Sequence, residues 1–132
     1  MDFGRNVGFE AGLAIWEKDY ALNLIFEERK NQTKVGNNNA EIYFESTNLE
    51  SLYNQLKKED IKIIHEIREQ PWGQKVFRIY DPDNHIIEFA ESMTSLVLRL
   101  HSKRFTTEEI SKKTMMPPEF IKMIIQQHSI TQ

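Results

Sequence analysis

The sequence predicts an α+β fold, because two kinds of residue pattern divide the chain. Between residues 40 and 91, four stretches have the composition and spacing of β-strands, and a helix-like apolar stripe follows the first of them. After Ser92, the apolar residues recur only at helical spacing. We therefore expect a β-α-β-β-β sheet module followed by a helical extension.

The N-terminal part of the chain predicts a small amount of mixed structure. Residues 7–16 alternate in polarity and contain Gly8 and Gly12, which favours one bent strand or two short ones. Residues 19–28 have helix-compatible apolar spacing with Asp19 as a cap, although some of the apolar residues also alternate. Residues 30–39 are polar and rich in asparagine, which indicates a loop or a linker.

The first strand and helix of the module are clear in the sequence. Residues 40–46 alternate strictly, so that Ile42 and Phe44 face one way while Glu41, Tyr43 and Glu45 face the other. Residues 49–59 then place leucine and tyrosine side chains on one helical stripe, with charged residues on the opposite side.

Three further strands complete the module. Residues 61–68 form the second strand, and residues 69–73 form a turn. The last two strands, residues 75–80 and 86–90, are joined by Asp81-Pro82-Asp83-Asn84, which has the composition of a tight turn. Glu88 is a lone carboxylate within the last apolar strand, which indicates a rim position, a cationic partner or a bound ligand.

The C-terminal tail predicts three helices. They cover residues 93–103, a segment that begins at Thr106 or Thr107 with a capping-box pattern, and residues 119–127 after a break at Pro117. From residue 95 onward, six Lys and Arg residues against three Glu residues give this tail a net charge of +3. Its outline resembles a helix-turn-helix, so it either packs on the sheet or a partner subunit, or contacts DNA.

Composition excludes several classes of protein. Of the 132 residues, 39% are hydrophobic and 28% are charged, as in a globular domain, and the net charge of −3 gives no overall attraction to nucleic acid or acidic membranes. The absence of cysteine excludes disulfides and thiolate sites. No apolar run approaches the ~20 residues that span a bilayer, and the N-terminus lacks a signal-peptide pattern, so we expect a cytoplasmic protein.

Residues 40–91, ending in Asp81-Pro82-Asp83-Asn84-His85 and a strand with Glu88, resemble the vicinal oxygen chelate superfamily, which includes glyoxalase I, bleomycin-resistance proteins and extradiol dioxygenases. Residues 2–16 (D-F-G-x-N-V-x-F-E-x-G-x-A-I-W) look like the hairpin of a first, incomplete module. The resemblance implies a curved mixed sheet of paired β-α-β-β-β modules around a ligand cup. It divides the chain into a glyoxalase-like domain (1–92: partial module 1–30, linker 31–39, second module 40–92) and a helical extension (93–132).

The same resemblance implies a metal site. Glu88 matches the late ligand of the second module, and Glu41 lies where many members carry a ligand on the first strand, so a divalent Zn, Ni, Mn or Fe ion would be held by this pair. The alternative is that Arg78, on the neighbouring strand, pairs with the carboxylates and replaces the metal.

Other side chains are candidates for ligand binding or catalysis. Trp16, Tyr43, Arg78 and Tyr80 would line the cup, and ordinary core or rim packing is the alternative for the aromatic residues. His65 is a weak candidate for an acid/base catalyst, with a half-exposed sheet histidine as the alternative.

Three functions remain open. The first is a glyoxalase/bleomycin-resistance-like protein that binds a small organic ligand, with metal-dependent lyase, isomerase or dioxygenase chemistry if it is an enzyme. The second is a metal-free binding or sequestering dimer without catalysis, and the third is a DNA-associated accessory protein that uses the tail. The resemblance implies that the first module lacks its first strand, and the edge left open predicts a homodimer or strand exchange with another copy of the chain.

Overall fold

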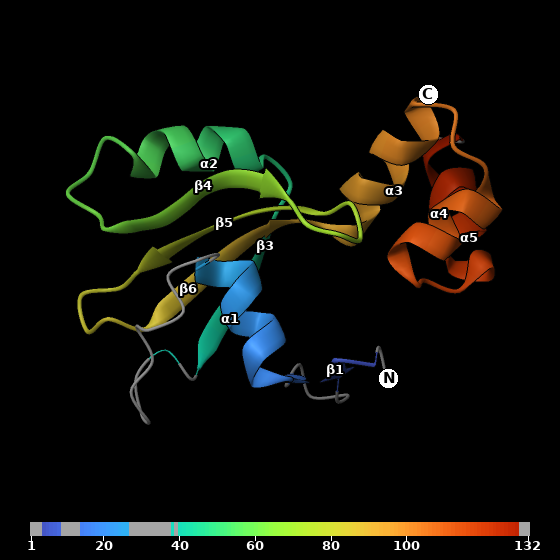
Figure 1. Ribbon diagram of the computed structural model, residues 1–132. Helices are drawn as coiled ribbons and strands as arrows, with labels where there is room; N and C mark the ends of the chain where they lie inside the picture. Colours follow the sequence, from blue (N-terminus) through green and yellow to red (C-terminus); the bar gives the residue numbers. More distant parts are fainter. Residues whose placement is uncertain (1–3, 9–13, 27–37, 39, 130–132) are drawn as a thin grey trace. The chain divides into compact units, whose positions relative to one another are not determined.

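A computed structural model describes residues 4–8, 14–26, 38 and 40–129 of the chain (Figure 1). The chain forms two compact units, Met1–Ala40 and Glu41–Gln132. The predicted loop at residues 30–39 and the expected bend at Gly12 lie outside the described residues, except for Asn38.

The N-terminal unit contains a short hairpin and a helix. β1 (Asn6–Gly8) pairs antiparallel with β2 (Ala14–Trp16), and α1 (Lys18–Phe26) follows at once. Two short strands therefore form, rather than one bent strand. The Trp16 ring stacks on Tyr20 with centroids 5.9 Å apart, so the end of β2 packs on the first turn of α1.

A four-stranded mixed sheet organises the second unit. Its strands are β3 (Glu41–Ser46), β4 (Ile63–Glu69), β5 (Lys75–Tyr80) and β6 (Ile86–Glu91), in the spatial order β3-β6-β5-β4. β3 runs parallel to β6, while β5 is antiparallel to both of its neighbours. The α+β fold with a β-α-β-β-β module is confirmed. β4 starts two residues later than predicted, because the Ile61 amide is already bonded to the Glu59 carbonyl in a turn.

Helix α2 (Leu49–Leu56) lies over one face of this sheet and closes an apolar core (Figure 1). The Asn48 side chain caps its N-terminus by accepting a hydrogen bond from the Ser51 amide. The core beneath the helix consists of Leu49, Tyr53, Phe77, Ile79 and Ile87, with Phe89 packed against it. Burial of these side chains is the main stabilisation of the sheet.

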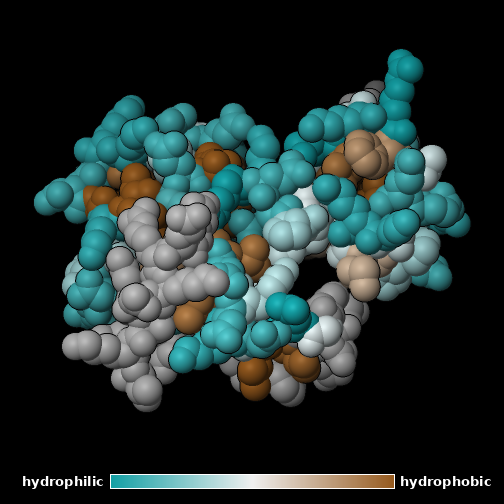
Figure 2. Space-filling view, in the orientation of Figure 1, coloured by the Kyte–Doolittle hydropathy of each residue, from teal (hydrophilic) through white to brown (hydrophobic). Residues whose placement is uncertain are grey.

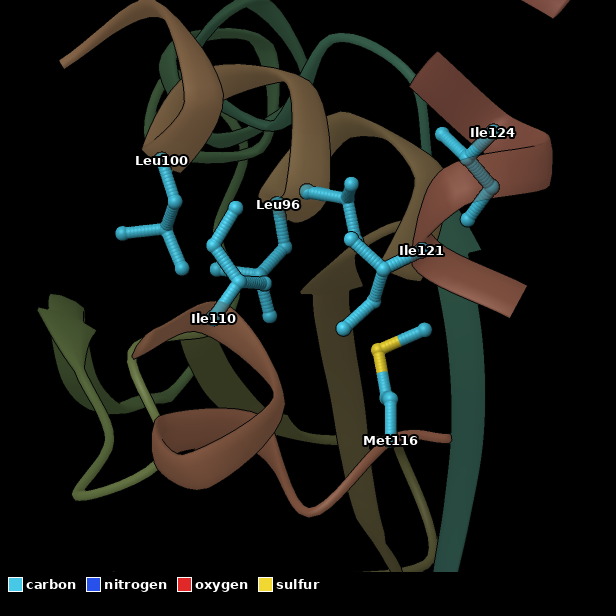
Figure 3. Close-up of a cluster of buried hydrophobic side chains, with 7 residues drawn as sticks. Leu96, Leu100, Ile110, Met116, Ile121 and Ile124 are labelled. Carbon is cyan, nitrogen blue, oxygen red and sulfur yellow. The ribbon is translucent and has the colours of Figure 1, made fainter. Parts of the chain in front are cut away.

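Three helices follow the sheet: α3 (Met93–Ser102), α4 (Thr107–Thr114) and α5 (Pro118–Ser129). They share a second buried cluster, shown in Figure 3, formed by Leu96, Val97, Leu100, Ile110, Met116, Ile121 and Ile124. Thr106 and Glu109 form the predicted capping box at the start of α4. The helical extension expected after Ser92 is therefore present, with a hydrophobic core of its own.

Arg99 on α3 joins the helices to the sheet. Its guanidinium donates hydrogen bonds to the Glu91 carboxylate at 2.7 Å and to the Gly73 carbonyl at 2.6 Å. Gly73 has φ of +91°, a backbone conformation that L side chains rarely adopt, so the turn after β4 favours glycine. The turn, β6 and α3 thereby meet around one charged group.

Hydrophilic side chains cover much of the described surface seen in Figure 2, with separate apolar patches between them. Within the described part of the chain, no helix combines the length and the apolar character needed to cross a bilayer.

Candidate functional site

The strand register brings the predicted polar residues into one row across the sheet. Tyr43 lies beside Glu88, Glu88 beside Arg78, and Arg78 beside His65. Since directly opposed residues in a sheet point to the same face, these four side chains share the face opposite α2. The expectation that Glu41 and Glu88 share a face is met by this register.

Arg78 is the centre of the row. Its Nε donates a hydrogen bond to Oε2 of Glu41 at 2.6 Å, and its guanidinium also forms an ion pair with Glu88. The Arg78 side chain is 1% exposed and that of Glu88 is 5% exposed, whereas the Glu41 side chain is 24% exposed. Burial lowers the pKa of Arg78, and the adjacent Glu41 opposes that shift. Arg78 thus bridges both candidate metal ligands.

His65 closes the other end of the row. Its Nδ1 lies 2.8 Å from the Glu66 carbonyl, which can only accept a hydrogen bond, so Nδ1 carries the proton. Nε2 then accepts from Arg78 at 3.1 Å. Burial, with added repulsion from Arg68 and Arg78, lowers the pKa of His65 to about 4. His65 is therefore neutral at pH 7. The lone pair on its Nε2 already accepts a hydrogen bond from Arg78, which disfavours His65 as a general base.

Tyr43 is held by a second hydrogen-bond network. Its hydroxyl accepts a hydrogen bond from Gln74 at 3.0 Å and lies 3.0 Å from Glu45, to which it donates. Gln74 also donates to the Glu91 carbonyl at 2.7 Å, and Trp72 donates to Gln74. Burial raises the pKa of Tyr43, which keeps the phenol protonated. The sequence reading missed Gln74, and only its position at the start of a buried strand could have indicated it.

The other aromatic candidates are placed differently. Tyr80 is half-buried on the same face as Arg78, and the Lys62 ammonium lies 4.8 Å from the centre of its ring. Trp16 belongs to the N-terminal unit, where it packs on Tyr20. Of the aromatic candidates, Tyr43 and Tyr80 therefore share the sheet face with Arg78.

The turn between β5 and β6 holds a separate polar cluster. Carboxylate oxygens of Asp81 and Asp83 and a ring nitrogen of His85 lie within 4.8 Å of one another. The Asp81 carboxylate accepts hydrogen bonds from the amides of Asp83 and His85 and pairs with the His85 ring at 2.9 Å. These bonds lower the pKa of Asp81 and raise that of His85. The cluster is explained by stabilisation of the turn.

The arrangement around Arg78 does not fit a divalent ion held by Glu41 and Glu88. Both carboxylates face the same guanidinium, and the neighbouring imidazole also accepts a hydrogen bond from it, so a positive charge already lies between the candidate ligands. A cation bound there would lie beside a buried positive charge. Arg68 on β4 adds a second positive charge close to Arg78 and His65.

Helices α4 and α5 are joined by a three-residue segment, as the helix-turn-helix outline predicts. The exposed residues in the first turns of α5 include Glu119, Phe120, Lys122 and Met123. With one acidic and one basic residue among apolar ones, this surface lacks the basic patch that binds the phosphates of nucleic acid. DNA binding by this tail stays a prediction.

Comparisons with known proteins place the chain in a family. The glyoxalase-like domain family model matches residues 1–94. A solved protein of unknown function from Agrobacterium tumefaciens str. C58 is 38% identical, with 70% of this chain and 72% of that chain covered and a TM-score of 0.42. No curated protein matches the chain significantly.

Two more distant solved structures are also similar. One is a member of the glyoxalase/bleomycin resistance protein/dioxygenase superfamily from Sphaerobacter thermophilus DSM 20745, with 20% identity, 40% and 44% of the two chains covered, and a TM-score of 0.38. The other is TioX from Micromonospora sp. ML1, with 12% identity, 48% and 54% covered, and a TM-score of 0.37. With the family match over residues 1–94, the chain belongs to the glyoxalase-like domain family of the vicinal oxygen chelate superfamily.

Proposed function

We propose that this protein binds a small organic ligand without a metal ion, and that Arg78 takes the place that a metal would occupy between Glu41 and Glu88. The observation that carries the proposal is the contact of one buried guanidinium with both carboxylates. A guanidinium neutralises carboxylates through fixed hydrogen bonds, but it offers no open coordination position for a substrate oxygen. Metal-assisted lyase, isomerase or dioxygenase chemistry therefore has no support from these residues.

The most accessible charged group of the cluster indicates the chemistry of the ligand. Glu41 is the most accessible of the charged groups, while Arg78 and Glu88 are almost fully buried. A ligand that approaches this face therefore meets a carboxylate before it meets the guanidinium. The accessible Glu41 carboxylate favours a ligand with an amine or another hydrogen-bond donor over one with a carboxylate. The half-buried Tyr80 ring on the same face would contact the apolar part of such a ligand.

The first experiment measures metal binding by calorimetry. Wild-type protein is titrated with Zn²⁺, Ni²⁺, Mn²⁺ and Fe²⁺, and we expect no stoichiometric binding to it. In Arg78→Ala, Glu41, Glu88 and His65 lose their common partner, and we expect Zn²⁺ or Ni²⁺ binding to appear. Stoichiometric metal on the wild type that is lost in both Glu41→Ala and Glu88→Ala would overturn the proposal.

The second experiment tests ligand charge with a matched pair of probes. Benzylamine and benzoate have the same ring and opposite charges. Each is added at millimolar concentration, and the shift in the Tm of the protein is measured. We expect benzylamine to raise Tm more than benzoate, and the difference to vanish in Glu41→Gln. Glu45→Gln is the control, because Glu45 lies on the same strand and face but does not contact Arg78. A larger shift with benzoate would show that the charge argument is wrong.

A further inference from the structure

The second unit contains two separate apolar cores. Among the described residues, the buried cluster of α3, α4 and α5 takes all of its members from these helices, and the cluster under α2 takes none from them. Polar contacts join the two parts at the turn between β4 and β5. Arg99 on α3 bonds to Glu91 and Gly73, and Lys113 on α4 lies 3.6 Å from Glu69. The helices therefore act on the sheet at this turn, through directional bonds (Figure 1).

The ion pair of Arg99 and Glu91 holds the backbone on both sides of Gln74. Arg99 donates a hydrogen bond at 2.6 Å to the Gly73 carbonyl, which belongs to the peptide group before Gln74. The Glu91 carboxylate accepts a hydrogen bond at 3.2 Å from the Lys75 amide, which belongs to the peptide group after Gln74. Rotation of either peptide group would break one of these bonds. The ion pair therefore sets the direction in which the Gln74 side chain leaves the backbone.

The side-chain amide of Gln74 in turn holds Tyr43. Its oxygen accepts a hydrogen bond from the Trp72 indole at 2.9 Å, and its nitrogen donates to the Glu91 carbonyl at 2.7 Å and to the Tyr43 hydroxyl at 3.0 Å. Because an indole N–H can only donate, the amide oxygen faces Trp72 and the nitrogen is left for Tyr43. Gln74 is 4% exposed and Tyr43 is 45% exposed. A buried amide with all of its positions engaged thus holds an exposed ring in place.

The ion pair and Tyr43 lie on opposite faces of the sheet. Side chains alternate along β6, so Glu91 shares the α2 face with Phe89, while Glu88 and Tyr43 share the other face. Gln74 connects the two faces, because its backbone is held by the ion pair and its side chain reaches Tyr43. A change at α3 is therefore transmitted to the face that carries the ligand site.

We propose that Arg99 is a positioning residue for the ligand face, and that the helical extension acts on this face through Gln74 and Tyr43. The inference rests on the ligand site proposed above, since Tyr43 lies two residues from Glu41 on the same face. A ring that is fixed before the ligand arrives does not have to be ordered on binding. Ordering one such side chain weakens binding roughly fivefold. Release of Arg99 would thus weaken the site without a change in any residue that contacts the ligand.

The position of Tyr43 is measured first, without a ligand. Carbon-13 at Cζ of tyrosine reports the hydrogen bonds of the phenol oxygen, and Tyr43→Phe assigns the signal. Arg99→Lys keeps the charge beside Glu91 but loses the planar fork that bonds two groups at once, so we expect the Tyr43 signal to shift and broaden. Lys113→Met is the control, because it removes an ion pair between the helices and Glu69, and the signal should stay unchanged. An unchanged signal in Arg99→Lys, or equal shifts in both variants, would overturn the proposal.

A double variant tests whether Arg99 acts through Gln74. Gln74→Met removes the amide and should move the Tyr43 signal at least as far as Arg99→Lys does. In the Gln74→Met background, Arg99→Lys should cause no further shift, because the connection is already broken. A second shift of the same size would mean that Arg99 reaches Tyr43 by another route, and the proposed one would be wrong.

The effect on the ligand site is measured with benzylamine as the probe, in an NMR titration. We expect Arg99→Lys to bind benzylamine roughly fivefold more weakly than wild type, and Lys113→Met to bind it equally well. Equal affinities of wild type and Arg99→Lys would overturn the role of Arg99 at the ligand face. If the wild type binds no benzylamine, the proposed function fails, and the Tyr43 signal still decides whether Arg99 positions that ring.

Discussion

The two faces of the β3-β6-β5-β4 sheet differ in what they bury. On one face, aromatic rings from three adjacent strands stack under α2, with Phe77 at 0% exposure. On the other face of the same strands, Arg78 is equally buried but is surrounded by Glu41, Glu88 and His65. Residues next to each other in sequence, such as Phe77 and Arg78, therefore lie in opposite environments.

The two faces also contribute differently to stability. Apolar burial stabilises a sheet in proportion to the area removed from water, whereas a buried ion cluster has to offset the desolvation of every charge in it. Apolar side chains of similar size in place of the charged ones would give the folded sheet at least the same stability. The ligand site that we propose lies on the charged face, while the apolar α2 face holds the sheet together.

Phe77→Ala should have the largest effect, because it removes the central ring of the apolar face. The lost burial and the cavity left behind predict a loss of about 4 kcal/mol in the free energy of unfolding. Urea denaturation measures this loss. The conservative Phe77→Leu should cost less than half as much. If Phe77→Ala were nearly neutral, the apolar face would not be the stabilising one.

Arg78→Met should come next, at about 3 kcal/mol, because it leaves the buried Glu88 carboxylate without its counter-ion. The double variant Arg78→Met/Glu88→Leu removes both buried charges and should recover stability to within about 1 kcal/mol of wild type. It should nevertheless lose any preference for benzylamine over benzoate. A double variant as unstable as the single one would contradict the separation of the two faces.

Tyr43→Phe should cost about 1 kcal/mol, since the buried Gln74 amide loses a hydrogen-bond acceptor. The free energy of unfolding of Tyr43→Phe is measured by chemical denaturation. Tyr20→Phe is the control, because it removes a hydroxyl from the N-terminal unit. The Tyr43 variant should be the less stable of the two. Equal stabilities would mean that the Tyr43–Gln74 network does not contribute to folding.

The last effect concerns pH. The pKa of His65 falls from 6.5 to about 4 in the folded chain, so between these values the unfolded chain binds the additional proton. The His65 contribution to stability is therefore complete above pH 6.5 and declines as the pH falls toward 4. The free energy of unfolding is measured by denaturation at pH 7 and at pH 5. Between pH 7 and pH 5 it should fall less in His65→Gln than in the wild type. An identical pH dependence would show that His65 is not buried in its neutral form.

Much of the fold could be predicted from local pattern alone. The strict alternation in residues 41–46 separates Ile42 and Phe44 from Tyr43, and Asp81-Pro82-Asp83-Asn84 has the turn chemistry that joins β5 to β6. The positive φ of Asn84, +65°, is the left-handed conformation that asparagine tolerates in such turns. These features depend on neighbouring residues, so the sequence by itself determined them.

The content of the site was decided by the tertiary structure. Glu41 and Arg78 are 37 residues apart, and their contact depends on the parallel pairing of β3 with β6 and on its register. Periodicity assigns each residue to a face of its own strand, but it does not say which residue of another strand lies opposite. The sequence therefore left a metal and an arginine as alternatives between Glu41 and Glu88. The register brings Arg78 to both carboxylates, because β5 and β6 align Arg78 with Glu88 directly.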